Sequence, residues 1–219
     1  MRMDGKTALP QPIPISPLKR AFDVIASAIV MVVLSPAMLI MFVLMGIEHM
    51  LRPVARGPIL YKELRISQGK PFAFYKIRTF KLTALEKASG NGVVHTKKLE
   101  HDFRNLTITG MVLIQTYLDE FPQLFLALIG KMSFVGPRPI NPEVYERDIA
   151  SGKITLHVLK AGLTGRFQTH KSAKYGLVQK DVDMDYVHLC RNCSGLQVLR
   201  HDTRVLFETV YTIFRAEGI

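Results

Sequence analysis

The sequence has few cysteines and few acidic residues. Only two cysteines, Cys190 and Cys193, occur among 219 residues, which excludes a disulfide framework and indicates a reducing compartment. Acidic residues number 18 against 29 lysines and arginines, so the formal net charge is +11. A charge of this size indicates an anionic partner, such as nucleic acid, an acidic membrane surface or a phosphorylated substrate. No internal repeat or low-complexity tract is present.

Charged residues are missing altogether from residues 24–47. A helix of these 24 residues would be about 36 Å long, which exceeds a hydrocarbon core of about 30 Å. Basic residues flank both ends, and positive charge marks the cytoplasmic side of a membrane. Ser35-Pro36 lies near the middle, where a proline removes a helical hydrogen bond. We therefore expect a re-entrant helix-break-helix that enters and leaves by one face; a straight span and a buried soluble helix are the alternatives.

The sequence also predicts where this helix begins. Ser16 before Pro17 is typical of a helix N-terminus, with serine as the cap and proline in the first turn. Asp23 lies at the mouth of the apolar segment, where an unpaired carboxylate is costly. It should pair with Lys19 or Arg20, which lie four and three residues earlier on the helix.

The most informative stretch runs through Asp119 and Glu120, two adjacent carboxylates followed by Pro122 and an apolar run. Because proline is tolerated in the first turn of a helix, the carboxylates should lie at or just before a helix N-terminus. The helix dipole stabilises negative charge there. The pair could simply cap the helix, or could hold Mg²⁺ together with substrate phosphates. These residues alone leave both interpretations open.

Two further segments carry cations that could bind phosphate. Residues 58–80 should form two short strands around a turn at 68–71. The second strand places Lys76 and Arg78 on one face, either as a solvated basic edge or as a pair directed at a pyrophosphate. Prolines on both sides hold Arg138 in a stiff extended turn, which suits either an idle surface arginine or fixed recognition of phosphate.

The predicted fold class is α+β and mainly helical. The remaining elements are expected as a helix from 141 within 141–159, a turn at 162–165, a basic loop at 171–176, and one or two amphipathic helices over 186–219. Residues 81–104 are expected to form a surface helix or a loop insertion. Cys190 and Cys193, with His188 and His201 nearby, allow a zinc hypothesis. One C-x-x-C with two flexible histidine spacings is a weak signal, and ordinary reduced cysteines are favoured.

Several of these motifs occur together in a fixed order: Lys19-Arg20-x-x-Asp23, Ser35-Pro36, Pro58-Ile59 before Gly69-Lys70-Pro71-Phe72, Lys76-Ile-Arg78-Thr79, Leu118-Asp119-Glu120-Phe-Pro122-Gln123-Leu124, Met132-Ser133-Phe-Val-Gly136-Pro137-Arg138-Pro139, and Gly162-Leu-Thr-Gly165. The ordered set resembles the bacterial sugar transferases, which are monotopic polyprenyl-phosphate hexose-1-phosphate transferases (phosphoglycosyl transferases). The resemblance runs from about residue 16 to the C-terminus and is to the minimal catalytic-domain form of the family.

The resemblance implies transfer of a sugar 1-phosphate from a nucleoside-diphosphate sugar, usually a UDP-sugar, to a polyprenyl phosphate, usually undecaprenyl phosphate, to start a glycan. Asp119 would be the nucleophile that forms a covalent phospho-sugar intermediate, and Glu120 would hold Mg²⁺. Lys76, Arg78 and Arg138 would contact phosphate or nucleotide. The hairpin would lie among the lipids of the bacterial inner membrane, with the rest on the cytoplasmic face. No nucleic-acid partner is expected, since no nucleic-acid motif occurs.

The sequence departs from the family pattern at Met111 and Ile114, where members usually carry arginine, and at Glu63 and Ala161. Two alternatives therefore stand beside the enzyme: a non-catalytic, membrane-anchored basic protein, and a family member without activity. The expected organisation is a flexible lead-in at 1–15, a re-entrant membrane hairpin at 16–52 and a catalytic domain at 53–219.

Overall fold

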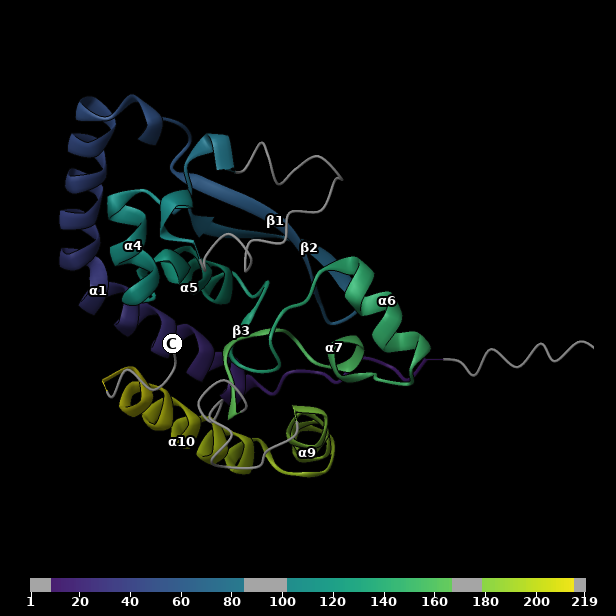
Figure 1. Cartoon of the computed structure of the whole chain (residues 1–219). Helices are drawn as coiled ribbons and strands as arrows, with labels where there is room; N and C mark the ends of the chain where they lie inside the picture. Colours follow the sequence, from purple (N-terminus) through teal and green to yellow (C-terminus); the bar gives the residue numbers. More distant parts are fainter. Residues whose placement is uncertain (1–8, 85–101, 167–178, 215–219) are drawn as a thin grey trace, which may run out of the picture. The chain divides into compact units, whose positions relative to one another are not determined.

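The structure is a computed structural model that describes residues 9–84, 102–166 and 179–214. These residues are mainly helical with short strands, which confirms the predicted class (Figure 1). The helices are α1 (Pro17–Leu51), α4 (Ile108–Gln115), α5 (Phe121–Leu128), α6 (Pro142–Ala150), α7 (Thr155–Val158), α9 (Gln179–Asn192) and α10 (Gly195–Phe214). Short 3-10 helices are η1 (Pro53–Ala55), η3 (Phe103–Asn105) and η4 (Leu118–Glu120). The strands are β1 (Leu60–Ser67), β2 (Lys70–Ile77), β3 (Ser133–Val135) and β4 (Gly162–Thr164).

The chain divides into two compact units. The first contains Met1–Ser27, Leu64–Ala73 and Leu126–Ile219, and the second contains Ala28–Glu63 and Phe74–Phe125. Helices α1 and α5 and the β1–β2 hairpin each contribute residues to both units. Each unit is therefore assembled from segments that are far apart in the sequence.

Helix α1 is a single helix of 35 residues with Pro36 inside it. Its predicted start is confirmed, because the Lys19 backbone N–H donates to Ser16 Oγ at 3.2 Å. The helix is not interrupted at Pro36, and the re-entrant arrangement stays a prediction. Ser35 Oγ donates to the Val32 carbonyl at 2.8 Å, and that carbonyl is the one that proline at position 36 cannot bond. By length and composition α1 could cross a membrane.

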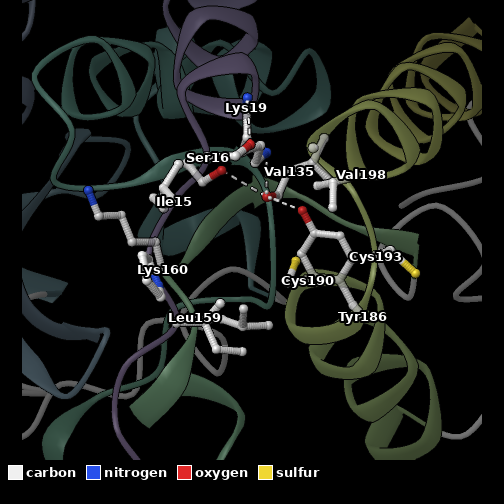
Figure 2. A pocket seen from close by; sticks show the side chains of 14 residues that line it. Ile15, Ser16, Lys19, Val135, Leu159, Lys160, Tyr186, Cys190, Cys193 and Val198 are labelled. Atoms are coloured by element: carbon white, nitrogen blue, oxygen red, sulfur yellow. Dashed lines mark hydrogen bonds between the residues drawn. The ribbon is translucent and has the colours of Figure 1, made fainter.

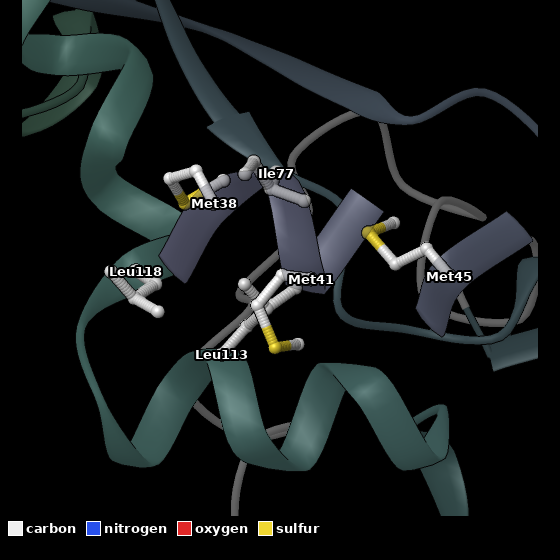
Figure 3. Close-up of a cluster of buried hydrophobic side chains, with 6 residues drawn as sticks. All are labelled: Met38, Met41, Met45, Ile77, Leu113 and Leu118. Atoms are coloured by element: carbon white, nitrogen blue, oxygen red, sulfur yellow. The ribbon is translucent and has the colours of Figure 1, made fainter. Parts of the chain in front are cut away.

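The core of the second unit explains why one side of α1 is rich in methionine. Figure 3 shows three methionines of α1 meeting apolar side chains of β2, α4 and η4: Met38, Met41, Met45, Ile77, Leu113 and Leu118. The methionine spacing of three and four residues places them on one face of the helix. Other α1 side chains, including Val32, Val33 and Leu39, are exposed. The apolar segment therefore has one face packed against protein and another that exposes large apolar side chains.

The first unit contains a short parallel sheet, in which Ser133 pairs with Gly162 and Val135 pairs with Thr164. The predicted turn at 162–165 is therefore wrong, since Gly162–Thr164 form β4. A Cβ atom added to Gly162 would lie 2.1 Å from the backbone nitrogen of Gly136. The glycine at 162 is needed because two backbones approach closely, and not because the chain turns there.

Other predicted elements are confirmed. The β1–β2 hairpin turns at Gln68 and Gly69, whose φ angles are 52° and 71°. The helical prediction from residue 141 corresponds to α6, and the predicted C-terminal helices are α9 and α10. The basic loop at 171–176 and most of 81–104 lie outside the described residues.

Candidate active site

The paired carboxylates lie at the start of a helix, as predicted. Asp119 and Glu120 belong to η4, which leads directly into α5, and Pro122 is the second residue of α5. The preceding residue, Tyr117, has φ 57° and ψ 14°, a left-handed conformation that is uncommon for a side chain other than glycine, asparagine or aspartate. This residue turns the chain between α4 and the carboxylates.

A lysine from strand β2 bridges the two carboxylates. Lys76 Nζ lies 3.1 Å from Asp119 Oδ2 and 3.0 Å from Glu120 Oε1. The Asp119 side chain is only 9% exposed, against 22% for Lys76 and 24% for Glu120. Burial alone would lower the pKa of the Lys76 ammonium, but the charges of Glu120 and Asp119 and their hydrogen bonds outweigh burial and raise that pKa above its usual range. The lysine therefore stays protonated beside the carboxylates.

Arg78, two residues further along, is directed at different partners. Its side chain is almost fully buried, and all three guanidinium nitrogens donate to backbone carbonyls. Nε donates to Pro58 at 2.7 Å, Nη2 to Ala55 at 2.7 Å, and Nη1 to Phe80. Burial lowers the pKa of this guanidinium, although Glu48 opposes the shift. Contact between Arg78 and phosphate stays a prediction, and such contact would require these carbonyl bonds to be given up.

Arg138 belongs to the other unit. It follows β3 directly, and its side chain is exposed between the buried residues Pro137 and Pro139. The Arg138 side chain is therefore accessible, while both neighbouring prolines are packed into the protein. Its contact with phosphate or nucleotide stays a prediction.

Sequence reasoning missed a carboxylate that anchors the helix leading to the site. Glu48 Oε1 accepts a hydrogen bond from the Ile108 N–H at 2.8 Å, and Oε2 accepts from the Thr109 N–H at 3.0 Å and the Thr109 hydroxyl at 2.6 Å. The N-cap residue, Thr107, accepts from Gly110 N–H at 2.9 Å. The end of α1 thus holds the first turn of α4. The only sequence signal for this role was a single carboxylate directly after the uncharged segment.

The first unit holds a buried cluster of charges near the start of α1. Lys19 Nζ lies 2.9 Å from Asp23 Oδ1 and 2.5 Å from Asp202 Oδ2, so the predicted Lys19–Asp23 pair is confirmed. The Ser133 hydroxyl donates to Asp23, and the Tyr186 hydroxyl donates to Asp202 at 2.9 Å. The pairing of Lys19 with Asp202 was not predicted, because the two residues are far apart in the sequence.

This cluster borders a small pocket whose lining includes both cysteines (Figure 2). Cys190 and Cys193 are free thiols. Burial and the nearby Asp202 carboxylate raise the pKa of Cys190 to about 11, which disfavours the thiolate that a metal would need. Within residues 9–84, 102–166 and 179–214 no group of three His, Cys, Asp or Glu side chains could hold a metal ion. The zinc hypothesis therefore gains no support.

The Asp119–Glu120 pair fits the requirements of Mg²⁺ with phosphate. Both side chains supply carboxylate oxygens, and the contacts to one Lys76 ammonium hold an oxygen of each close together. Mg²⁺ is held by one or two carboxylates while phosphates and waters complete its octahedral shell. Chemically, one acid of the pair can act as a nucleophile while the adjacent acid acts as a metal ligand.

Comparison with known proteins gives consistent matches. Residues 15–216 match the sequence model of a family described as bacterial sugar transferase. The undecaprenyl-phosphate galactose phosphotransferase of Salmonella typhimurium is 30% identical over 92% of this chain and 41% of its own length. The UDP-glucose:undecaprenyl-phosphate glucose-1-phosphate transferase of Escherichia coli is 30% identical over 90% of this chain and 40% of its own. EpsL of Bacillus subtilis, described as an uncharacterized sugar transferase, is 31% identical over 92% of this chain and 90% of its own length. The chain spans about two fifths of the first two relatives.

Proposed function

Because the chain belongs to the bacterial sugar transferase family, we propose that it transfers a sugar 1-phosphate from a UDP-sugar to undecaprenyl phosphate and so starts the assembly of a glycan. The names of the Salmonella and Escherichia relatives support the acceptor and the type of transfer. The observation that carries the proposal is the Lys76-bridged pair of Asp119 and Glu120 at the head of α5. A cap alone would not need a partly buried lysine between two acids.

Asp119 is the nucleophile in this proposal. One of its carboxylate oxygens forms a bond to the phosphorus that carries the sugar, and the bond from that phosphorus to the UMP oxygen breaks, so that UMP leaves with the electron pair. An oxygen of the lipid phosphate then attacks the same phosphorus and displaces the Asp119 carboxylate. Two steps at one carboxylate allow the water-soluble donor to leave before the lipid arrives.

The other residues hold charge during these steps. Mg²⁺ held by Glu120 would offset the negative charge of the diphosphate when it is bound. Lys76, kept protonated by its neighbours, can donate to the phosphoryl group at Asp119. Arg138 is proposed to contact the diphosphate or nucleotide, and Arg78 would do so only after release from its carbonyl partners. A site built from an acid pair and cations suits phosphoryl transfer, in which positioning and electrostatics supply most of the catalysis.

We propose that α1 bends at Pro36 without losing its helical structure, so that it re-enters the inner membrane and leaves the rest of the chain on the cytoplasmic face. Basic residues at both ends of the apolar segment, Pro36 within it and its exposed apolar side chains support this arrangement. Cysteines introduced singly at Leu18 and Leu51, in a background without native cysteines, should both react from the cytoplasmic side. Labelling of the two positions from opposite sides would overturn the re-entrant arrangement.

The function is tested by measuring UMP release from a panel of UDP-sugars with Mg²⁺ and undecaprenyl phosphate. We expect turnover with at least one donor, and Asp119→Asn should lower it by at least about 1,000-fold because the nucleophile is lost. The variant should still fractionate with membranes. Absence of release with every donor would favour a non-catalytic basic protein or an inactive family member. Replacing Met111 and Ile114 by arginine would then distinguish these alternatives, because a gain of turnover would identify an inactive family member and no gain would favour a non-catalytic basic protein.

A further inference from the structure

Gln123 has a buried side chain that the proposed mechanism does not use. It lies on α5 and is 2% exposed. Its Nε2 donor has no hydrogen-bond partner within the part of the chain that the structure describes. Buried amide donors in folded proteins are nearly always paired, so an unpaired one calls for a physical reason.

The position of Gln123 points to the carboxylate pair. It follows Glu120 by three residues and Asp119 by four, and η4 passes into α5 through Phe121, which has helical φ and ψ of −48° and −40°. Side chains three and four residues apart share one face of a helix. Helical side chains also tend to lean toward the helix N-terminus, which for a residue at position 123 is the end of α5 that carries the acids.

Three consecutive positions at the helix start, 120–122, have no free backbone donor for a ligand. A phosphate at a helix N-terminus is normally held by the free N–H groups of the first turn. Here the Glu120 N–H donates to the Tyr117 carbonyl at 3.2 Å, and the Phe121 N–H donates to the Leu118 carbonyl. Pro122 has no N–H at all. These three positions therefore offer no backbone donor to a ligand at Asp119, and a neutral side-chain donor nearby would add one.

We infer that Gln123 Nε2 donates a hydrogen bond to a phosphoryl oxygen of the group bound at Asp119, which makes Gln123 a substrate-contacting residue. This inference rests on the proposed function. The phosphoryl oxygen can belong to the sugar phosphate brought by the nucleotide donor or to the phosphate of the lipid acceptor. A neutral donor at this position adds a directed hydrogen bond without further charge beside Lys76.

The test combines a stability measurement with the two half-reactions. Gln123→Met keeps the length of the side chain and removes the donor, and Leu124→Met is the matched control because Leu124 is equally buried on the same helix. Each protein is melted, and UMP release from a UDP-sugar without lipid is timed. Discharge of the preformed adduct by undecaprenyl phosphate is timed separately, at a temperature well below the melting transition.

We expect Gln123→Met to melt at or above the wild-type temperature, since it removes an unpaired buried donor. At least one of the two rates, UMP release or adduct discharge, should slow by roughly 100- to 1,000-fold, the order of the loss when one oxyanion donor is removed. Slowing of UMP release alone assigns the contact to the donor's phosphoryl group, and slowing of discharge alone assigns it to the lipid phosphate. Leu124→Met should change neither rate by more than about threefold.

Unchanged rates in Gln123→Met, at any melting temperature, would overturn the inference. So would a lowered melting temperature with equal loss of rate in Leu124→Met, because both residues would then serve packing alone. Failure of the proposed function is distinguished by measuring UMP release with the wild-type protein. If wild type releases no UMP from any donor, the function fails before Gln123 is tested.

Discussion

Replacement of Lys76 by methionine tests whether the lysine holds two carboxylates together. The ammonium lies 3.1 Å from Asp119 and 3.0 Å from Glu120. Removing one partner of a fully buried ion pair costs about 3–5 kcal/mol. Lys76 and Glu120 are 22% and 24% exposed, so water screens part of the loss. We expect Lys76→Met to lower the free energy of unfolding by about 2–3 kcal/mol at pH 7.5, or roughly 5–10 °C in Tm.

The pH dependence identifies the cause of this loss. The pKa of Lys76 is raised in the folded protein, so its stabilisation is fully present below the unfolded lysine pKa of about 10.4 and is lost only as pH rises through the folded value. In Lys76→Met the adjacent carboxylates repel each other when both are ionised. The deficit should therefore be large at pH 7.5 and should shrink toward pH 4.5, where protonation relieves the repulsion.

Thermal melts of detergent-purified wild type and Lys76→Met at pH 4.5, 6 and 7.5 measure this effect. Lys153→Met is the matched control, because Lys153 pairs with Asp148 at 3.0 Å but is 44% exposed. An exposed pair of this kind contributes at most about 1 kcal/mol. An equal deficit for Lys76→Met at all three pH values, or a deficit no larger than that of the control, would refute the bridging role.

Three further predictions concern residues outside the carboxylate pair. Gly110→Ala should lower the free energy of unfolding by at least about 2 kcal/mol, because an added Cβ would lie 2.1 Å from the backbone oxygen of Thr79. Gly46→Ala is the control and should be tolerated, because an added Cβ there has no atom within 4 Å. Similar melting temperatures for the two variants would contradict this prediction. Glu48→Ala should cost about 2 kcal/mol and lower turnover, because it removes the acceptor for α4, and unchanged melting would contradict the anchoring role. In folded Cys193→Ser, Cys190 should be alkylated at pH 8 roughly 100-fold more slowly than in the same variant unfolded by denaturant, because the pKa of Cys190 is raised to about 11. Equal rates in the folded and unfolded protein would contradict the burial of Cys190.

Local signals in the sequence predicted local structure well. Ser16 and Pro17 mark the start of α1, and Pro122 marks the helix that follows the carboxylates. Each of these signals depends on which backbone groups are unpaired at a helix end, which is a property of a few adjacent residues. The Lys19–Asp23 pair was predictable for the same reason, since the two residues are one helical turn apart.

Features that depend on distant contacts were not predictable. The pairing of β3 with β4 joins segments about 30 residues apart, and only the structure shows that Gly162 is needed for close backbone approach. The sequence could not show that α1 stays helical through Pro36, where the Ser35 hydroxyl bonds the carbonyl that proline leaves free. Alternation along a strand placed Arg78 beside Lys76, but could not show that loop carbonyls bind its guanidinium.

The central claim is that Asp119 becomes covalently linked to the sugar phosphate. Intact-mass spectrometry of the purified protein, incubated with Mg²⁺ and a panel of UDP-sugars without lipid, tests this most directly. The account predicts a mass gain equal to one sugar phosphate, absent in Asp119→Asn and discharged by undecaprenyl phosphate. UMP release with undecaprenyl phosphate but without any adduct, or an adduct that persists in Asp119→Asn, would contradict it.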